Sequence, residues 1–305
     1  MLDLVTIGHL TIDRIFPPKI FASKPTLGGP PTYVSLAARK LGANAAVISK
    51  VGGDFPSEYV AWLKANGVDL FGLKQVRNAS TTRFLLKYKR GGRELQLESR
   101  APSIYPEDVP NSLRAKVAHA ASVANELSIG IIDKLRALTD TLSLDPQGFL
   151  RRFDAQGNAK LGRWEETGIL RQIDVYKSSL SEIKVATGLT NLQLAMQKIH
   201  SYGPRMIIVT RGKKGSSLLT DGEICEIPAC KPRVVKDLTG AGDAFMGAFL
   251  AEHIQGKDPA WCACVGSSAS SFVIEGKGPT LFGEKKETYK RATEIYEKGL
   301  KRSTI

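Results

Sequence analysis

The residues best suited to chemistry lie in one short stretch, "TGAGDAFMGAFL" (239–250), in which small residues surround an acid. Gly240, Ala241 and Gly242 stand at the start of an apolar run with helical spacing. The first turn of a helix has unsatisfied N–H groups and carries partial positive charge, and small side chains let an anion approach them. The stretch therefore predicts an anion hole suited to a phosphoryl group in transfer.

Asp243 falls in the first turn of the same predicted helix. An ionised acid beside a phosphate pocket repels the phosphate, and accepting a proton from an attacking hydroxyl would give the acid a purpose. A helix-capping acid behind a tight glycine turn explains this stretch equally well. The stretch is neither a Walker A loop, because G-x-x-x-x-G-K-[ST] is absent, nor G-x-G-x-x-G, because Phe245 occupies the place of the last glycine.

The elements that would position this stretch alternate between apolar strands and helices. Strands are predicted over 2–8, 45–52, 141–145, 173–179 and 205–210, and helices over 30–43, 56–67, 258–276 and the charged C-terminal segment. Strands that alternate with helices are typical of a mostly parallel sheet with helices on both faces. The predicted fold class is therefore α/β.

One region departs from this alternation. Residues 80–99 hold two extended runs around Gly91 and Gly92, with apolar residues on one side of each run. This pattern predicts a β-hairpin. The hairpin is either an additional edge of the sheet or, with residues 11–18, a small β lid over the site.

Composition limits the partners and the compartment. The 43 basic and 30 acidic residues leave a net charge of +13, which favours an anionic partner or a generally basic surface. The basic residues are dispersed, so nucleic acid is not expected as the main partner. The C-terminal cluster is predicted to be a solvated helix with three i,i+4 pairs: Glu287 with Arg291, Glu294 with Lys298, and Glu297 with Lys301.

No apolar run approaches the length of a membrane span, and charged residues among the first twenty argue against a signal peptide. The four cysteines have neither zinc-binding spacing nor the density of a disulfide scaffold. The expected protein is cytoplasmic and reduced, with no membrane partner.

Several motifs resemble those of the ribokinase-like (PfkB) carbohydrate kinase family. "DLTGAGDAF" (237–245) resembles its C-terminal signature, and "LGGPPTYVSLAARKLGANAAVISKVGGD" (27–54) resembles its N-terminal one. "TRGKKGS" (210–216) is similar to the nucleotide-binding segment, and "GHLTIDRI" (8–15) to the first strand with its substrate-binding aspartate. Together they span residues 4 to about 278 in the family's order and spacings, which makes the set specific.

The resemblance implies a single kinase domain over 1–305, a three-layer α/β/α sandwich whose small β lid is formed by about 11–26 and 80–99. It implies transfer of the ATP γ-phosphate to a hydroxyl, with ATP and Mg²⁺ as cofactors. Carried over position by position, Asp243 is the catalytic base and the backbone of Gly240, Ala241 and Gly242 is the anion hole. The remaining roles are acceptor binding by Asp13, Gly28, Gly29 and Tyr33, and ATP binding by Thr210, Gly212 and Gly215.

Two departures from the family pattern affect these roles. The motif N-x-x-E, which organises magnesium and phosphates in the family, here reads "SLSE" (179–182), so Ser179 replaces asparagine and Glu182 is left as an indirect magnesium residue. Leu238 replaces the signature threonine, and Asp237 leaves a monovalent-cation site open.

Tyr33 stands where ribokinases proper carry an asparagine that binds the sugar, which disfavours ribose. Tyr33 and "DPQGFLRR" (145–152) resemble the archaeal myo-inositol kinase subgroup, although Tyr33 is equally well explained by helix packing against the lid.

The sequence leaves three hypotheses for the function. The first is an ATP-dependent kinase for a sugar, a cyclitol such as myo-inositol, or a nucleoside, with Asp243 as general base. The second is a nucleoside kinase of the same family. The third belongs to another class: a non-catalytic basic binding protein that retains the fold. The assembly is expected to be a monomer or a homodimer formed through the lid.

Overall fold

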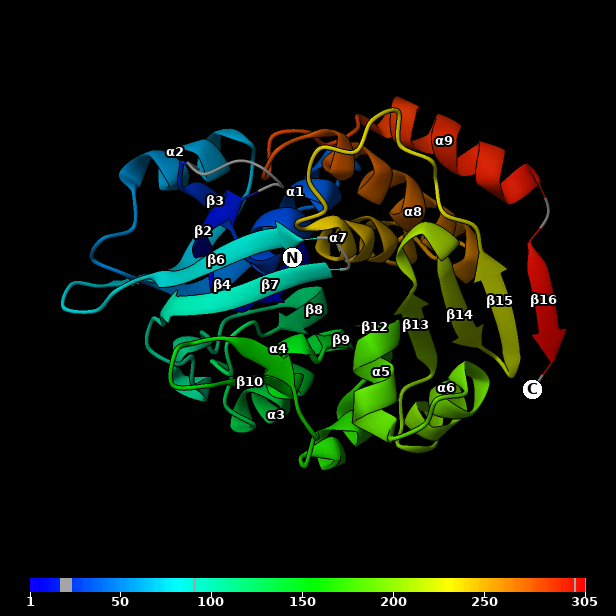
Figure 1. Cartoon of the computed structure of the whole chain (residues 1–305), viewed down its shortest axis with the longest axis horizontal. Helices are drawn as coiled ribbons and strands as arrows, with labels where there is room; N and C mark the ends of the chain where they lie inside the picture. The colour runs from blue at the N-terminus through cyan, green and yellow to red at the C-terminus, as the bar shows by residue number, and fades with distance from the viewer. Residues whose placement is uncertain (17–23, 90–91, 299, 305) are drawn as a thin grey trace.

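A computed structural model describes residues 1–16, 24–89, 92–298 and 300–304. Its main sheet has ten strands in the order β16-β15-β14-β13-β12-β9-β8-β1-β4-β5 (Figure 1). From β5 to β13 the strands are parallel, as predicted, although β5 and β8 were not among the strands predicted from the sequence. Strands β14, β15 and β16 add an antiparallel edge that was not predicted either. Their bounds are β1 Leu2–Ile7, β4 Ala45–Gly52, β5 Asp69–Val76, β8 Ala115–Ala121, β9 Thr139–Asp145, β12 Val175–Ser179, β13 Met206–Thr210, β14 Ser216–Thr220, β15 Glu223–Ile227 and β16 Lys301–Thr304.

Helices cover both faces of this sheet, which confirms the three-layer prediction (Figure 1). Strand β1 shows the cause, because Leu4 packs into the hydrophobic core on one face and Val5 into the core on the other. Along a strand, successive side chains point to opposite faces. The first face carries α1 (Pro30–Lys40), α7 (Ala241–His253), α8 (Pro259–Glu275) and α9 (Lys285–Glu297), and the second carries α3 (Gly130–Arg136), α5 (Leu180–Thr187) and α6 (Leu192–Ser201).

The remaining elements are short. Helix α2 (Ser57–Ala65) packs near β5, and α4 (Gln147–Leu150) follows β9 directly. A two-stranded sheet pairs β10 with β11, and single 3₁₀ turns lie elsewhere: β10 Arg151–Phe153, β11 Ala159–Leu161, and the turns Pro106–Asp108, Thr167–Gln172 and Gly212–Lys214. None of the helices in the described residues has both the length and the apolar character that crossing a membrane requires.

A separate four-stranded sheet contains the predicted hairpin. Its order is β3-β2-β6-β7, from β3 (Thr26–Gly28), β2 (Thr11–Phe16), β6 (Thr82–Lys89) and β7 (Gly92–Ser99). Strands β6 and β7 pair antiparallel, so the hairpin is confirmed, although Gly91 and residues 17–23 of the predicted lid lie outside the described part of the chain. The apolar side of 84–88, which could have formed a dimer contact, packs within the chain: Phe84 and Leu86 are buried with Val123.

The C-terminal segment differs from the prediction. Helix α9 ends at Glu297, and Lys301 lies in β16, so these two residues are not an i,i+4 helical pair. Arg291 donates to Glu275 of α8 at 2.8 Å rather than pairing with Glu287, and its guanidinium lies 3.6 Å from the centre of the Phe272 ring. The ion pairs of the described residues do not include Glu294 with Lys298. Helical spacing predicts neighbours on one helix only, and it misses a partner on the next helix.

The packing of α1 against α7 positions the glycine turn. Tyr33 of α1 is buried, and its ring lies against Gly240, which has a left-handed backbone with φ of 76°. A methyl group on Gly240 would lie 2.2 Å from Tyr33 Cδ1, which is far inside van der Waals contact. Position 240 therefore needs glycine for two reasons: the positive φ and the close approach of the tyrosine ring.

We predict that Gly240→Ala lowers the free energy of unfolding more than Gly188→Ala does. Both glycines have left-handed backbones, with φ of 76° and 72°, but a methyl group on Gly188 meets no atom within 4 Å. The shared backbone strain costs about 1–2 kcal/mol, and forcing Tyr33 aside adds about 1–3 kcal/mol at position 240 only. Chemical denaturation of the two variants measures the difference, and equal losses would show that the tyrosine contact contributes nothing.

Candidate active site

The strands of the parallel sheet end around a cavity of about 250 Å³ that is closed on one side by the small sheet. The carboxyl ends of parallel strands lie at one edge of a sheet, where ligands of open α/β folds bind. The cavity brings together most of the predicted site residues with several that the sequence analysis did not name. Its polar lining comprises Thr11, Asp13, Tyr33, Arg93, Gln147, Arg151, Lys177, Ser179, Glu182, Thr210, Thr239, and Gly240 to Asp243.

The glycine turn opens helix α7 as predicted. Gly240 is the N-cap, Ala241 is the first helical residue, and no side chain caps the helix. Asp243, half-buried on the cavity wall, therefore does not act as a helix cap, which removes the alternative explanation for this acid. The Ala241 N–H donates to the Leu238 carbonyl at 3.4 Å, so the N–H groups of Gly240 and Gly242 are those that remain available to an anion.

A buried ion pair lies beneath this turn. Lys177, in the middle of β12, donates to Asp145, the last residue of β9, over 2.6 Å, and both side chains are almost inaccessible to solvent. A methyl group on Gly242 would lie 2.9 Å from Lys177 Nζ, so the ammonium group directly contacts the turn. Burial lowers the pKa of Lys177, but Asp145 and Asp243 more than offset it and leave that pKa raised.

The same groups set the ionisation of Asp243. Burial raises the pKa of Asp243 to about 6, opposed first by the positive charge of Lys177. Asp145 raises this pKa further, and Arg151 and Arg93 lower it. A carboxyl group with a pKa near 6 is ionised at neutral pH, yet it is a stronger base than an ordinary aspartate.

Asp13 is the second buried acid of the cavity. It lies on β2 in the small sheet and accepts a hydrogen bond from Thr11 Oγ1 at 2.7 Å. Burial raises the pKa of Asp13 to about 7, against the effects of Thr11, Arg93 and Arg151. Gly28 faces this carboxylate, because a methyl group there would lie 2.0 Å from Asp13 Oδ2.

The predicted acceptor-side residues occupy different places. Gly29 and Tyr33 line the cavity, whereas Gly28 supports Asp13 from behind and does not line it. The Tyr33 hydroxyl is buried without a hydrogen-bond partner, and the ring packs on Gly240 and near Phe282. Tyr33 therefore both packs against neighbouring residues and lines the cavity.

The "SLSE" segment forms the start of helix α5. Ser179 is its N-cap and accepts from the Glu182 N–H at 3.3 Å, while Glu182 Oε2 accepts from the Ser179 N–H at 2.7 Å. This reciprocal arrangement is a capping box, which satisfies two backbone donors at once. Both residues also line the cavity, so the carboxylate of Glu182 faces it from a fixed position.

Only one of the three predicted ATP-binding residues lines the cavity. Thr210, at the end of β13, lines the cavity, but Gly212 and Gly215 do not. Those two glycines enclose the exposed 3₁₀ turn that carries Lys213 and Lys214, on the outer side of Thr210.

Asp237 has a structural explanation. Its carboxylate accepts hydrogen bonds from the Thr239 N–H, the Gly278 N–H and the Tyr88 hydroxyl, at 2.9, 3.0 and 3.3 Å. These contacts account for the buried acid without a cation, and they join the hairpin to the loop before the glycine turn.

Sequence reasoning assigned no role to four charged residues of the site, Lys177, Asp145, Arg151 and Arg93, although Asp145 and Arg151 lie in the segment "DPQGFLRR" (145–152). Asp145 and Lys177 were visible as charged residues inside strands whose other residues are apolar or small. A charge within a buried strand needs a partner or a ligand, and this signal could have identified both residues. Arg151 and Arg93 could not be placed, because their positions depend on how α4 and the hairpin fold over the cavity.

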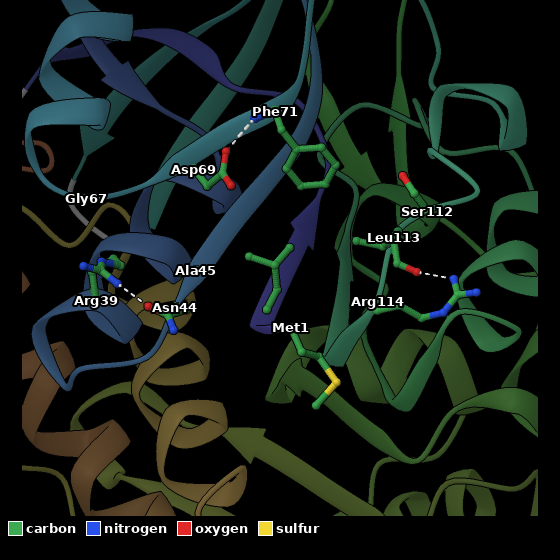
Figure 2. Close-up of a pocket in the computed structure, with 11 residues that line it drawn as sticks. Met1, Arg39, Asn44, Ala45, Gly67, Asp69, Phe71, Ser112, Leu113 and Arg114 are labelled. Atoms are coloured by element: carbon green, nitrogen blue, oxygen red, sulfur yellow. Dashed lines mark hydrogen bonds between the residues drawn. The ribbon is translucent and has the colours of Figure 1, made fainter.

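A larger hollow of about 560 Å³ lies at the opposite edge of the sheet, beside the first residues of β1, β4 and β5. Figure 2 shows Arg39 directed to Asn44, the Asp69 carboxylate bonded to the Phe71 N–H, and Arg114 bonded to the Leu113 carbonyl. Arg39, Asp69 and Arg114 thus have partners within the chain, although the Nε atom of Arg39 has none. This larger hollow contains no acid beside a glycine turn at the start of a helix. Its greater volume therefore does not make it the better candidate for the active site.

Comparison with solved structures agrees with this architecture. The chain superposes on a pyrophosphate-dependent kinase in the ribokinase family, complexed with a pyrophosphate analogue and myo-inositol, with a TM-score of 0.78 and 23% identity. The superposition covers 90% of this chain and 96% of that one. At this identity the likeness establishes the ribokinase-like α/β fold.

Comparison with curated sequences goes further. The cytidine kinase of Thermococcus kodakarensis is 30% identical over 292 residues, which cover 91% of this chain and 98% of that protein. A nucleoside kinase of Methanocaldococcus jannaschii is 26% identical over 91% of this chain and 92% of its own length. The family model described as pfkB family carbohydrate kinase matches residues 1–286. This chain therefore belongs to the PfkB family of carbohydrate kinases, phosphotransferases that act on hydroxyl groups.

Proposed function

We propose that this protein transfers the γ-phosphate of ATP to a hydroxyl of a polyhydroxylated small molecule, with Asp243 as the general base. The observation that carries the proposal is the position of Asp243, a carboxyl with a pKa of about 6 beside the uncapped N–H groups of the glycine turn. A binding protein needs the turn but has no use for a basic carboxylate next to it.

In the proposed reaction the acceptor lies between Asp13 and Asp243. Asp13 accepts hydrogen bonds from acceptor hydroxyls, and Asp243 takes the proton of the attacking hydroxyl. The acceptor oxygen forms a bond to the γ-phosphorus while the bond from that phosphorus to the bridging oxygen breaks. The electron pair of the broken bond remains on the leaving ADP, and the N–H groups of Gly240 and Gly242 stabilise the negative charge of the moving group.

ATP would approach from the side of Thr210, with Gly212 and Gly215 shaping the adjoining turn. Magnesium in proteins takes one or two carboxylates and leaves its other positions to water and phosphate. Glu182 fits that pattern, because it contributes one carboxylate to the cavity lining. Among the described residues, no cluster of three or more side chains could bind a metal without such water and phosphate ligands. Bound Mg²⁺ would neutralise phosphate charge, and Glu182 would orient its water ligands.

The cavity wall supports a ring-shaped acceptor. Phe84, Leu86, Leu95 and Val123 form an apolar wall, and Asp13 and Thr11 form a polar one. A nucleoside has both an apolar ring face and hydroxyl groups, and the relatives named above as cytidine and nucleoside kinases favour it. A cyclitol such as myo-inositol is the second candidate, because the fold relative described above was solved with myo-inositol.

A panel of cytidine, adenosine, myo-inositol, ribose and fructose 6-phosphate tests this proposal with ATP as donor. Transfer to at least one acceptor is expected. The absence of transfer to every acceptor, together with salt-sensitive binding of RNA or DNA, would instead support a non-catalytic basic binding protein.

We predict that Asp243→Asn lowers kcat by roughly 10²- to 10⁴-fold, the usual contribution of a general base, while a non-hydrolysable ATP analogue still binds. Steady-state kinetics and calorimetric titration provide the two measurements. Asp140→Asn is the matched control, because Asp140 is exposed on β9 and outside the cavity. Undiminished turnover in the Asp243 variant would remove this residue from the reaction.

We predict that kcat/KM falls in two steps as the pH decreases, through about 7 as Asp13 takes up a proton and through about 6 as Asp243 does, and that Lys177→Met moves the second step to higher pH. An ionised Asp243 is the active form, and burial raises its pKa to about 6 while Lys177 opposes that rise. Loss of a neighbouring opposite charge raises a carboxyl pKa by about 1 unit or more.

Two controls accompany this pH profile. Lys286→Met removes an exposed lysine of α9 and should leave the profile in place. Lys177→Met/Asp145→Asn removes both partners of the ion pair and avoids an unpaired buried acid, and it should give a smaller shift in the same direction. An unchanged profile in both Lys177 variants would disprove the electrostatic role of this lysine.

A further inference from the structure

Two arginines from different sheets line the cavity, and neither has a role in the reaction described above. Arg151 begins β10 of the two-stranded sheet, directly after α4. Its guanidinium donates to the Val123 carbonyl at 3.0 Å and to Gln147 Oε1 at 2.6 Å. The same guanidinium lies 5.9 Å from the centre of the Phe84 ring. Arg151 is thus held in place by neutral groups.

Arg93 approaches from the small sheet. It lies on β7, opposite Tyr88 of β6, and its positive charge acts on the Tyr88 hydroxyl and lowers the pKa of that group. That hydroxyl also contacts Asp237 and Thr239 Oγ1, at 3.3 and 3.1 Å, in the loop before the glycine turn. The position of Arg93 is therefore linked to the anion hole through one tyrosine.

The two cations lack anionic partners of their own. In the described part of the chain, no ion pair includes Arg93 or Arg151. Burial lowers the pKa of Arg151, and the nearby positive charge of Arg93 lowers it further. The two guanidinium groups therefore repel each other, and removing the partly buried Arg151 from water without a paired anion is costly, whereas Arg93 remains exposed.

The carboxylates near the cavity compensate the positive charge of Arg151 only at longer range. Glu182, Asp145 and Asp243 each raise the pKa of Arg151 without contacting it. Asp145 is already neutralised by Lys177, and Glu182 is engaged in the capping box of α5. An anion that enters between the two arginines would relieve their repulsion and find planar, multivalent donors on both sides.

We propose that Arg93 and Arg151 together bind a phosphate-type oxyanion, so that β7 of the small sheet and β10 of the two-stranded sheet each contribute one guanidinium to the same group. This inference rests on the proposed kinase function. The oxyanion has two sources: the phosphoryl group in transfer, or an anionic substituent of the acceptor. In either case the arginines contact non-bridging oxygens and exchange no proton. The reaction under "Proposed function" therefore stays the same: the same bonds form and break, and the proton still goes to Asp243.

The test uses Arg93→Gln, Arg151→Gln and the double variant. For each variant, kcat and KM are measured on the preferred acceptor of the panel and on matched pairs of a neutral and an anionic acceptor. The pairs are ribose with ribose 5-phosphate and fructose with fructose 6-phosphate. Lys87→Gln is the control, because Lys87 is an exposed cation of the same small sheet and lies outside the cavity lining. Arg151→Lys keeps the charge if Arg151→Gln fails to fold, and Arg93 is exposed, so its replacement should leave the fold intact.

If the arginines bind the moving phosphoryl group, each glutamine variant should lower kcat roughly 100-fold on every acceptor, with acceptor KM nearly unchanged. If they bind an acceptor substituent, kcat/KM should fall by a similar factor for the anionic acceptors only. Variants that retain kcat and KM on all acceptors, in an enzyme that is otherwise active, overturn the inference and leave the kinase function standing.

A wild-type protein that phosphorylates none of the acceptors would contradict the proposed function instead. Calorimetric titration with inorganic phosphate then decides the inference by itself. Weaker phosphate binding or a lost phosphate site in the double variant supports the arginine pair, and an unchanged isotherm overturns it.

Discussion

The structure depends on one electrostatic constraint: a carboxylate must remain ionised in a cavity that also has to accept phosphate. Burial and the neighbouring Asp145 both oppose ionisation of Asp243. The buried Lys177, fixed by its 2.6 Å contact with Asp145, supplies the main compensating charge. Lys177 also contacts Gly242, so one ammonium group connects the acid to the anion-binding turn.

The fold satisfies this constraint through its topology. Asp145 and Lys177 come from β9 and β12, which are neighbours in the parallel sheet, so their carboxyl ends lie together. Helix α7 brings Asp243 over that edge, and Tyr33 packed on Gly240 sets the position of its first turn. The small sheet then closes the cavity with Asp13 on β2 and Arg93 on β7.

Much of this arrangement could be predicted from the sequence, because local patterns encode it. The strand and helix alternation, the hairpin, and the glycine turn with Asp243 follow from hydrophobic period and turn chemistry, and each lies where it was expected. Strands β5 and β8 and the antiparallel edge formed by β14 to β16 were not predicted. Strand β16 is short and fully exposed, without an apolar pattern, whereas β14 and β15 carry buried apolar residues that a closer reading of the sequence could have used.

The contacts that cross between elements could not be predicted in this way. Arg291 fitted an i,i+4 pair with Glu287, but Glu275 on another helix lies closer, and no helical spacing contains that information. Ser179 and Glu182 were considered only as a departure from a metal-organising motif, whereas their capping box also explains both residue types. Arg151 and Arg93, 58 positions apart in the sequence, line the same cavity only once the hairpin and the segment after α4 have folded.

The central claim is that the cavity holds Asp243 as an ionised but unusually basic carboxylate. The most direct measurement follows the ¹³C chemical shift of the Asp243 carboxyl in the free protein during a pH titration, with the resonance assigned by its loss in Asp243→Asn. The account predicts a midpoint near pH 6. A midpoint near the ordinary aspartate value of 3.8 would contradict it.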